Sequence, residues 1–212
     1  MSRRAEILAA AVKLFRAHGV DGVGIDAVGA ALGLSGPALY RHFPGGKPEL
    51  LLAAFQSAGD RLGEALDASG AGWPDTTSLG VPGPRQRLAR VVVAHVDVAL
   101  GASDLVGLYL EEGHALPPTV REPLRRAEQA YLSRWSEVLC AARPELSPAA
   151  ARSLASAAVA MVNAAVQRPS TLGLERRREL LRAMALDVLL HTPTNRWNAA
   201  IAAGRGEVRD DR

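Results

Sequence analysis

Residues 35–42, Ser-Gly-Pro-Ala-Leu-Tyr-Arg-His, combine small residues with side chains that can hydrogen-bond to phosphate. Tyr40 and His42 supply the side-chain donors. Because the residues before them are small, a helix that begins there can approach a groove closely, with its free backbone N–H groups directed at an anion. The segment therefore predicts a short helix that binds a nucleic-acid backbone.

Neighbouring turns and helices must position this segment. Ile25, Val28 and Leu32 recur at the helical period, so one face of the preceding helix is apolar. Gly33 can adopt a positive φ and end that helix, and Ser35 can accept a hydrogen bond from a free backbone N–H and start the next one. The pair predicts a helix-turn-helix, a unit that reads duplex DNA.

Apolar stripes on either side complete a small N-terminal core. The upstream stripe consists of Ile7, Ala11, Leu14 and Phe15, and Gly19 closes that helix. The downstream stripe, on a longer helix, consists of Leu51, Phe55, Ala58, Leu62 and Leu66. The sequence therefore supplies the third helix that a helix-turn-helix domain needs for its core.

The ordered set ILAAAVKLF, Gly19, LGLSGPALYRHF and KPELL closely resembles the N-terminal domain of the tetracycline-repressor-like (TetR) family of bacterial transcription regulators. The resemblance covers about the first quarter of the chain and implies that Tyr40, His42 and Lys47 contact the DNA backbone. The full predicted DNA-contact set is Arg3, Arg4, Gly24, Ser35, Gly36, Pro37, Ala38, Tyr40, Arg41, His42 and Lys47.

Two positions depart from the pattern of that family. Val23 stands where a threonine usually caps the second helix and holds a phosphate, and Gly36 stands where a polar or basic residue is common. These changes predict one weaker anchoring contact and fewer direct base contacts. Arg3 and Arg4, expected just ahead of the first helix, form either a basic arm or a solvated N-terminus.

Two other interpretations fit residues 19–43 less well. A helical hairpin in an ordinary bundle has no reason to combine a tight turn, a short helix and an outward Tyr-x-His. Gly22 to Ala27 match the relaxed dinucleotide-binding pattern GxGxxA, but that pattern needs a strand before it. The preceding residues have a helical period, so we reject this interpretation.

Composition narrows the class of protein. The 212 residues are 48% hydrophobic and 22% charged, with a net charge of +3 that does not by itself indicate DNA binding. We expect a cytoplasmic protein without a membrane partner, because no apolar run approaches the roughly 18 residues that span a bilayer and no hydrophobic leader follows Met-Ser-Arg-Arg. The single cysteine, Cys140, forbids an intrachain disulfide.

Helical periodicity continues to about residue 190 without strand-like alternation, so the predicted fold class is all-α. Residues 67–84 are predicted to form a mobile loop and residues 193–212 a loosely held tail. We expect a three-helix DNA-binding domain at 1–46 and a larger ligand-binding and dimerisation domain at 47–192. The family resemblance implies that the linking helix, Pro48 to about Leu66, swings like a lever when the effector binds. In this helix Gly59 and Gly63 are the expected weak points.

The alanine-rich helix that Ser147 and Pro148 open can approach another helix closely. Residues 148–168 and 174–190 are therefore a candidate homodimer interface, which the family resemblance also implies; an internal core helix is the alternative. A twofold dimer would place its recognition helices about 34 Å apart and predicts a near-palindromic operator. The residues of the last helix expected to face inward are Leu181, Met184, Ala185, Val188 and Leu189.

Several polar side chains share helical stripes with aliphatic residues in the second domain. Such groups need partners, supplied either by one another or by a bound small molecule. We predict a pocket for an apolar effector with a polar end, and no metal or cofactor. Its predicted residues are His95, Tyr109, Glu112, Tyr131, Trp135 and Asn163.

The expected function is a ligand-responsive transcriptional repressor. The segments LPPTVREPLRR and RPELS, with Trp135, are similar to those of actinobacterial family members that sense acyl-CoA or related lipidic metabolites. A non-specific architectural DNA binder is an alternative. An all-α enzyme using His95, His114 and Glu111 or Glu112 is another, although the sequence contains no HExxH, GxSxG, P-loop or CxxC motif.

Overall fold

The computed structural model describes residues 2–68 and 83–192. Within these ranges every regular element is a helix, which confirms the predicted all-α class. The helices are α1 (Arg3–His18), α2 (Ile25–Ala31), α3 (Gly36–His42), α4 (Gly46–Ala68), α5 (Pro84–Gly101), α6 (Ser103–Glu112), α7 (Pro118–Ala142), α8 (Pro148–Val166) and α9 (Leu174–His191). Most of the predicted loop and the whole predicted tail lie outside the described residues.

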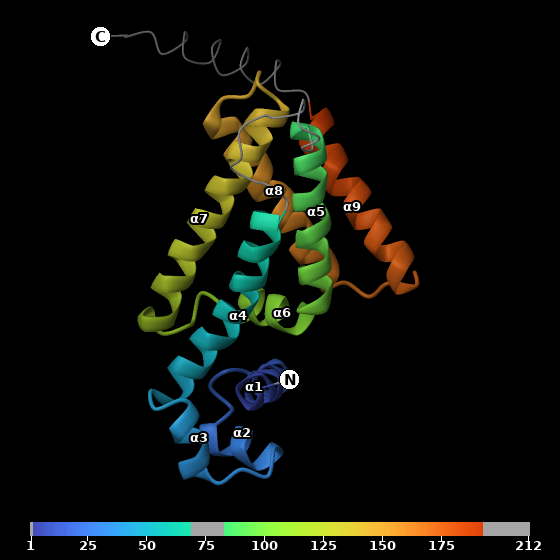
Figure 1. Ribbon diagram of the computed structural model, residues 1–212. Helices are drawn as coiled ribbons and strands as arrows, with labels where there is room; N and C mark the ends of the chain where they lie inside the picture. Colours follow the sequence, from blue (N-terminus) through green and yellow to red (C-terminus); the bar gives the residue numbers. More distant parts are fainter. Residues whose placement is uncertain (1, 69–82, 193–212) are drawn as a thin grey trace, which may run out of the picture.

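Helices α1 to α3 form a small unit at one end of the molecule, and α4 runs from it into a larger helical body (Figure 1). In that body α5 packs against α4, α7 and α9, while α8 packs against α7 and α9. The short helix α6 lies at the junction and packs against α1. Two helices, α4 and α6, therefore connect the small unit to the body.

The core of the small unit extends into α6. Phe15, Leu39 and Phe43 are almost completely buried, and they belong to the same apolar cluster as Leu105 and Leu108 of α6. Apolar packing thus crosses the domain boundary predicted at residue 46. A second cluster fills the larger body, with Trp135 as its largest fully buried side chain.

Helix α9 differs in part from its predicted pattern. Leu181, Ala185 and Leu189 are buried as expected, but Met184 is 41% exposed and Leu180 is 47% exposed. In a single chain these apolar side chains meet no neighbouring helix that would cover them. The inward position predicted for Met184 is therefore wrong, because the buried face of α9 is narrower than its apolar stripe.

The expectation that no segment is long and apolar enough to cross a membrane is wrong for helix α8. Of the described helices it alone passes that test of length and composition, and α5 with α6 would form a second span only as a pair bent by 83°. Only 28% of this apolar stretch of α8 is buried within the chain. A long apolar helix with much of its surface uncovered in one chain suits an interface between helices.

Arg143, which lies outside α9, caps the C-terminus of that helix. Its buried guanidinium donates to the carbonyl oxygens of Leu189 and Thr192 at 3.0 and 3.1 Å, and its Nε donates to Glu145 at 2.7 Å. These bonds satisfy backbone acceptors at the helix terminus that would otherwise lack partners.

We expect Arg143→Ala to lower the free energy of unfolding by about 2 kcal/mol, because it leaves those terminal carbonyls without their charged donor. Urea unfolding followed by circular dichroism measures the change. The exposed Arg125, whose ion pair with Glu122 lies on the surface, provides the matched control. An Arg125→Ala loss equal to that of Arg143→Ala would contradict the capping role.

Candidate nucleic-acid interface and adjoining cavity

The turn between α2 and α3 is held by two glycines. Gly33 has φ +65° as predicted, and the Leu34 N–H donates to the Gly29 carbonyl at 2.9 Å. A Cβ on Gly29 would lie 3.1 Å from the Leu34 oxygen, so the backbones approach closely only with glycine there. Leu39 and Phe43 are fully buried beneath, which fixes the orientation of α3.

The outer surface of α3 carries the predicted contact residues. Ser35, Pro37, Tyr40 and Arg41 are exposed, Tyr40 by 47%, whereas Gly36, Ala38 and His42 are partly buried. Ser35 occupies the N-cap position, but its hydroxyl makes no cap hydrogen bond, so that part of the prediction is wrong. The Ser35 carbonyl accepts from Ala38 and Leu39 instead, and its hydroxyl is left for another partner.

Arg3 and Arg4 belong to the first turn of α1 and do not precede it as a separate arm. Arg4 donates to the His42 carbonyl at 2.7 Å and lies 4.2 Å from the centre of the Phe43 ring. Arg3 pairs with Glu6 and donates to the Leu32 carbonyl at 3.2 Å. The two arginines therefore tie α1 to the ends of α2 and α3.

Lys47 lies in the first turn of α4, and its Nζ donates to the Val20 carbonyl at 2.9 Å. A phosphate contact by Lys47 would have to share or replace that bond. Val23, the departure from the family pattern, is 3% exposed and packs in the core. The N-cap residue of α2 is the exposed Gly24, and not Val23 as the family pattern implied, and it supplies no side-chain cap.

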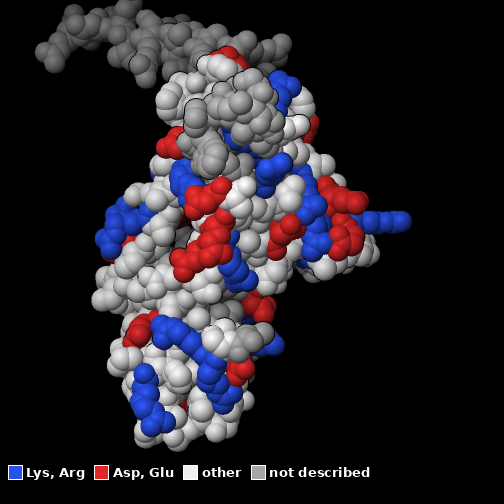
Figure 2. All heavy atoms as spheres, viewed as in Figure 1, with Lys and Arg blue, Asp and Glu red and all other residues white. Residues whose placement is uncertain are grey.

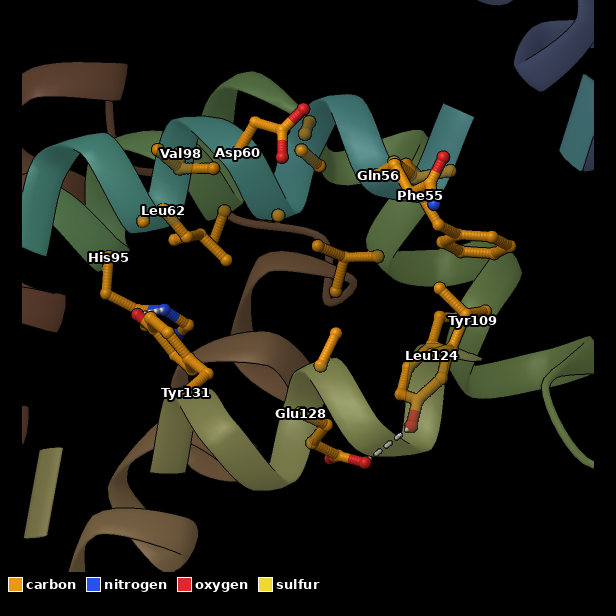
Figure 3. Close-up of a pocket in the computed structure, with 18 of the residues that line it drawn as sticks. Phe55, Gln56, Asp60, Leu62, His95, Val98, Tyr109, Leu124, Glu128 and Tyr131 are labelled. Carbon is orange, nitrogen blue, oxygen red and sulfur yellow. Dashed lines mark hydrogen bonds between the residues drawn. The ribbon is translucent and has the colours of Figure 1, made fainter. Parts of the chain in front are cut away.

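A cavity of about 540 Å³ lies in the larger body, between α4 and α7 and bounded by α5, α6 and α8 (Figure 3). His95, Tyr109, Tyr131 and Asn163 of the predicted set line it. Glu112 does not: its carboxylate lies near Gly19 at the end of α1. Trp135 is buried behind the wall, where its ring meets those of His95 and Tyr131 edge to face.

His95 is the most buried polar group of the cavity wall. Its Nδ1 lies 2.9 Å from the Tyr131 hydroxyl, and burial lowers the pKa of His95 to about 4. The backbone of Val159 and the side chain of Asn163 oppose part of this lowering of the pKa. The Nε2 atom of His95 has no hydrogen-bond partner among the described residues. His95 is therefore neutral at pH 7.

The buried His95 makes the stability depend on pH. Its folded pKa of about 4 lies below the ordinary histidine pKa of 6.5, so the unfolded chain binds the proton first as the pH falls. We expect stability to be fully present above pH 6.5 and to decrease by about 3 kcal/mol down to pH 4 through this group. Urea unfolding at several pH values should show a shallower pH dependence for His95→Phe; equal slopes would contradict the assignment.

A second polar pair closes the other end of the cavity. The Tyr109 hydroxyl donates to Glu128 at 2.9 Å, and burial and this carboxylate raise the pKa of Tyr109 to about 12 (Figure 3). The Tyr109 ring packs edge to face against Phe55, with centroids 6.0 Å apart. Among the described residues, no group of three or more His, Cys, Asp or Glu side chains could hold a metal ion.

Comparisons with known proteins match both units of the chain. Residues 7–54 match bacterial regulatory proteins of the tetR family, and residues 82–168 match the C-terminal domain of tetracyclin repressor-like proteins. The chain belongs to the TetR family. It is a TetR-family transcriptional regulator with a DNA-binding helix-turn-helix, as the sequence predicted.

Solved structures share the fold of this TetR-family protein. SCO3833 from Streptomyces coelicolor A3 is 25% identical, with 88% of this chain and 90% of that chain covered and a TM-score of 0.65. A TetR-family regulator from Bordetella parapertussis 12822 is 19% identical, with 91% and 96% covered and a TM-score of 0.72. AibR, in complex with isovaleryl coenzyme A and operator DNA, is 20% identical, with 86% and 97% covered and a TM-score of 0.66. Among curated proteins, none matches this sequence.

In this TetR-family protein one arginine joins the small unit to the body. Arg16 of α1 pairs with Glu111 of α6, and its Nη2 lies 3.3 Å from the Gln167 amide oxygen at the end of α8. Gln167 in turn donates to the Ser103 carbonyl at 2.8 Å. A Cβ on Gly107 would lie 2.3 Å from Gln167 and 2.7 Å from Arg16, so glycine makes room for this contact.

Sequence reasoning missed the cavity residues supplied by α4 and several of those from α7. Phe55, Asp60 and Gly63 line it from α4, and Glu128 and Arg134 from α7. Phe55 stands on the predicted apolar stripe of the linking helix, where its position fits an ordinary core equally well. An acidic residue such as Glu128 fits an ordinary solvated helix face equally well. The glycines of α4 were the available signal: a Cβ on Gly59 or Gly63 would meet nothing within 4 Å, so both face open space.

Proposed function

We propose that this TetR-family protein is a cytoplasmic homodimeric repressor, released from a near-palindromic operator when a small hydrophobic molecule occupies the α4–α7 cavity. One observation carries the proposal: α4 lines the cavity and also follows α3 after only three residues. A ligand that shifts α4 would therefore move the recognition helix. The ligand must prefer one position of α4, because equal affinity for both would change nothing.

The surface of α3 supports the DNA-binding part of the proposal. Ser35, Tyr40 and Arg41 are exposed hydrogen-bond donors at the start and along the outside of α3, and Pro37 is exposed as well. Arg4, which holds the end of α3 through His42 and Phe43, acts on DNA through the position of that helix. In AibR, the related structure already described, both a small molecule and operator DNA are bound.

Uncovered apolar residues support the dimer. Ala157, Ala160 and Ala164 follow one another along the exposed face of α8, and the exposed Leu180 and Met184 lie on α9. Small residues on one helix and larger apolar residues on the next allow close packing against a second copy. Two copies would place their recognition helices about one DNA turn, or about 34 Å, apart.

Selection of bound fragments from genomic DNA tests the repressor proposal. We expect recovered sites to be near-palindromic and bound at least about 10³-fold more tightly than random DNA at the same salt concentration. Equal binding of all fragments would identify an architectural DNA binder. Effector candidates are then titrated against the protein–operator complex, with binding followed by Trp135 fluorescence in a Trp73→Phe, Trp197→Phe background.

The Arg16 contact predicts a variant that separates effector binding from release. In Arg16→Ala we expect the effector to bind the cavity with unchanged affinity, while its effect on operator affinity falls at least about fivefold, within the usual range of coupling energies. Anisotropy titrations of a labelled operator with and without effector measure this ratio. Lys13→Ala, on the same helix but exposed, is the control; equal ratios in both variants would exclude Arg16 from the coupling.

A further inference from the structure

In the described part of the α4–α7 cavity the basic side chain has an ion-pair partner, but two acidic side chains do not. Arg134, the one arginine or lysine among the described lining residues, is bound by Asp67, so its charge is already compensated. Asp60 has no ion-pair or hydrogen-bond partner among the described residues, and Glu128 accepts only the neutral Tyr109 hydroxyl. Two carboxylates on the cavity wall therefore lack a positive partner.

These carboxylates lie on opposite walls of the same cavity. Figure 3 shows Asp60 on α4 and Glu128 on α7, with the aromatic rings of Phe55 and Tyr109 at one end and that of Tyr131 at the other. Acidic side chains also gather over the middle of this face of the molecule, along α4 (Figure 2). On α4 the sequence places Asp60, Glu64 and Asp67 one helical turn apart.

Aromatic faces and uncompensated carboxylates both attract positive charge. A cation gains from the negative face of an aromatic ring and from an unpaired carboxylate, and an anion loses at both. Asp60 and Glu128 are exposed residues that also line the cavity, so they act on a charge at its opening. The remaining wall, including Leu62, Val98 and Leu124, is apolar and suits a hydrophobic body. His95 is neutral and adds no positive charge that would offset Asp60 and Glu128.

We propose that the effector of this cavity is a hydrophobic cation, an amine or quaternary ammonium group on an aromatic or alkyl body. Its positive group lies between Asp60 and Glu128, and its body contacts Phe55, Tyr109 and Tyr131. The inference rests on the proposed function only in treating the cavity as the effector site. It departs from the acyl-CoA similarity, because a polyphosphate would meet unpaired carboxylates at this cavity.

Three probes that share one body test the charge preference. Calorimetric titrations use 2-naphthylmethyl-trimethylammonium, the neutral 2-naphthalenemethanol and the anionic 2-naphthylacetate. We expect the cation to bind at least about tenfold more tightly than the alcohol, and the anion to bind most weakly. In Asp60→Asn combined with Glu128→Gln, the affinity for the cation should fall about tenfold while that for the alcohol stays within about twofold.

Two further variants place the binding site. Glu64→Gln removes an exposed carboxylate on the same helix that does not line the cavity, and should leave all three affinities unchanged. Gly63→Phe fills the open space beside α4 and should abolish binding of every probe. Each variant is first compared with the parent protein by thermal unfolding, so that a loss of fold is recognised.

The outcomes separate this inference from the proposed function. Equal affinities for the three probes, an unchanged cation affinity in the double variant, cation binding that survives Gly63→Phe, or no cation binding at all would each overturn the cation inference. If the three probes bind equally well and Gly63→Phe abolishes their binding, the cation inference is wrong but the cavity remains a ligand site. Operator selection with the free protein tests the repressor independently of every probe.

Discussion

Replacing Pro37 with glutamate is expected to lower operator affinity at least about 100-fold while the protein stays folded. Pro37 is exposed in the first turn of α3, beside the Ser35 hydroxyl and one helical turn before Tyr40 and Arg41. A carboxylate there would face the phosphates that these groups are proposed to bind, and like charges in an interface are costly. A dimer carries the change twice, so a loss of about tenfold in each head gives about 100-fold in the pair.

The same substitution should not harm the helix, because acidic residues near a helix N-terminus interact favourably with its dipole. Pro118→Glu is the matched control, since Pro118 is also an exposed proline in the first turn of a helix, α7, in the larger body. Fluorescence anisotropy with the selected operator measures both variants, and circular dichroism checks the fold. Equal operator affinities of Pro37→Glu and the parent protein would remove α3 from the DNA interface.

The helix-turn-helix could be predicted because its determinants are local. The period of Ile25 and Val28, the positive φ of Gly33 and the burial of Leu39 all follow from residues within one short segment. Ser35 shows the limit of this reasoning. Its backbone takes the N-cap conformation as predicted, but its hydroxyl makes no cap bond, since side-chain orientation is decided by more than residue type and position.

The cavity could be predicted only in part, because its walls come from five helices. His95 and Asn163 were recognised as polar residues on apolar stripes, a signal that one helix carries alone. Trp135 and Glu112 carried the same signal but lie behind the wall and beside α1, respectively. Asp60 carried no signal, since an acidic residue on an amphipathic helix is normally solvated. It is exposed in the structure as well, and only the packing of α4 opposite α7 places it beside the cavity.

Long-range arginine contacts were beyond the reach of the sequence for the same reason. Arg143, the residue that follows α7, caps the end of α9, and Arg4 of α1 holds the end of α3. Arg16 joins α1 to α6 and α8 across residues far apart in the chain. The sequence around a long polar side chain is the same whether it faces solvent or bonds to another helix, because its partner is decided by tertiary packing.

Replacing Ala160 with arginine is expected to convert the proposed dimer into monomers and to lower operator affinity at least about 100-fold. Ala160 lies in the middle of the exposed alanine row of α8, so a twofold interface would bring its two copies close to the symmetry axis. Two arginines there would be too large for closely packed helices and would repel each other without counter-charges. Sedimentation equilibrium at micromolar concentration measures the change in assembly.

Ala141→Arg is the matched control, because Ala141 is likewise an exposed alanine in a long helix, α7, outside the proposed interface. Arginine is a good helix former, so neither change should reduce the stability of the folded chain by more than a few tenths of a kcal/mol. A dimeric Ala160→Arg protein would therefore exclude this face of α8 as the interface. Monomers that kept full operator affinity would show instead that one recognition helix is sufficient, because linking two heads multiplies affinity only if both engage the same DNA.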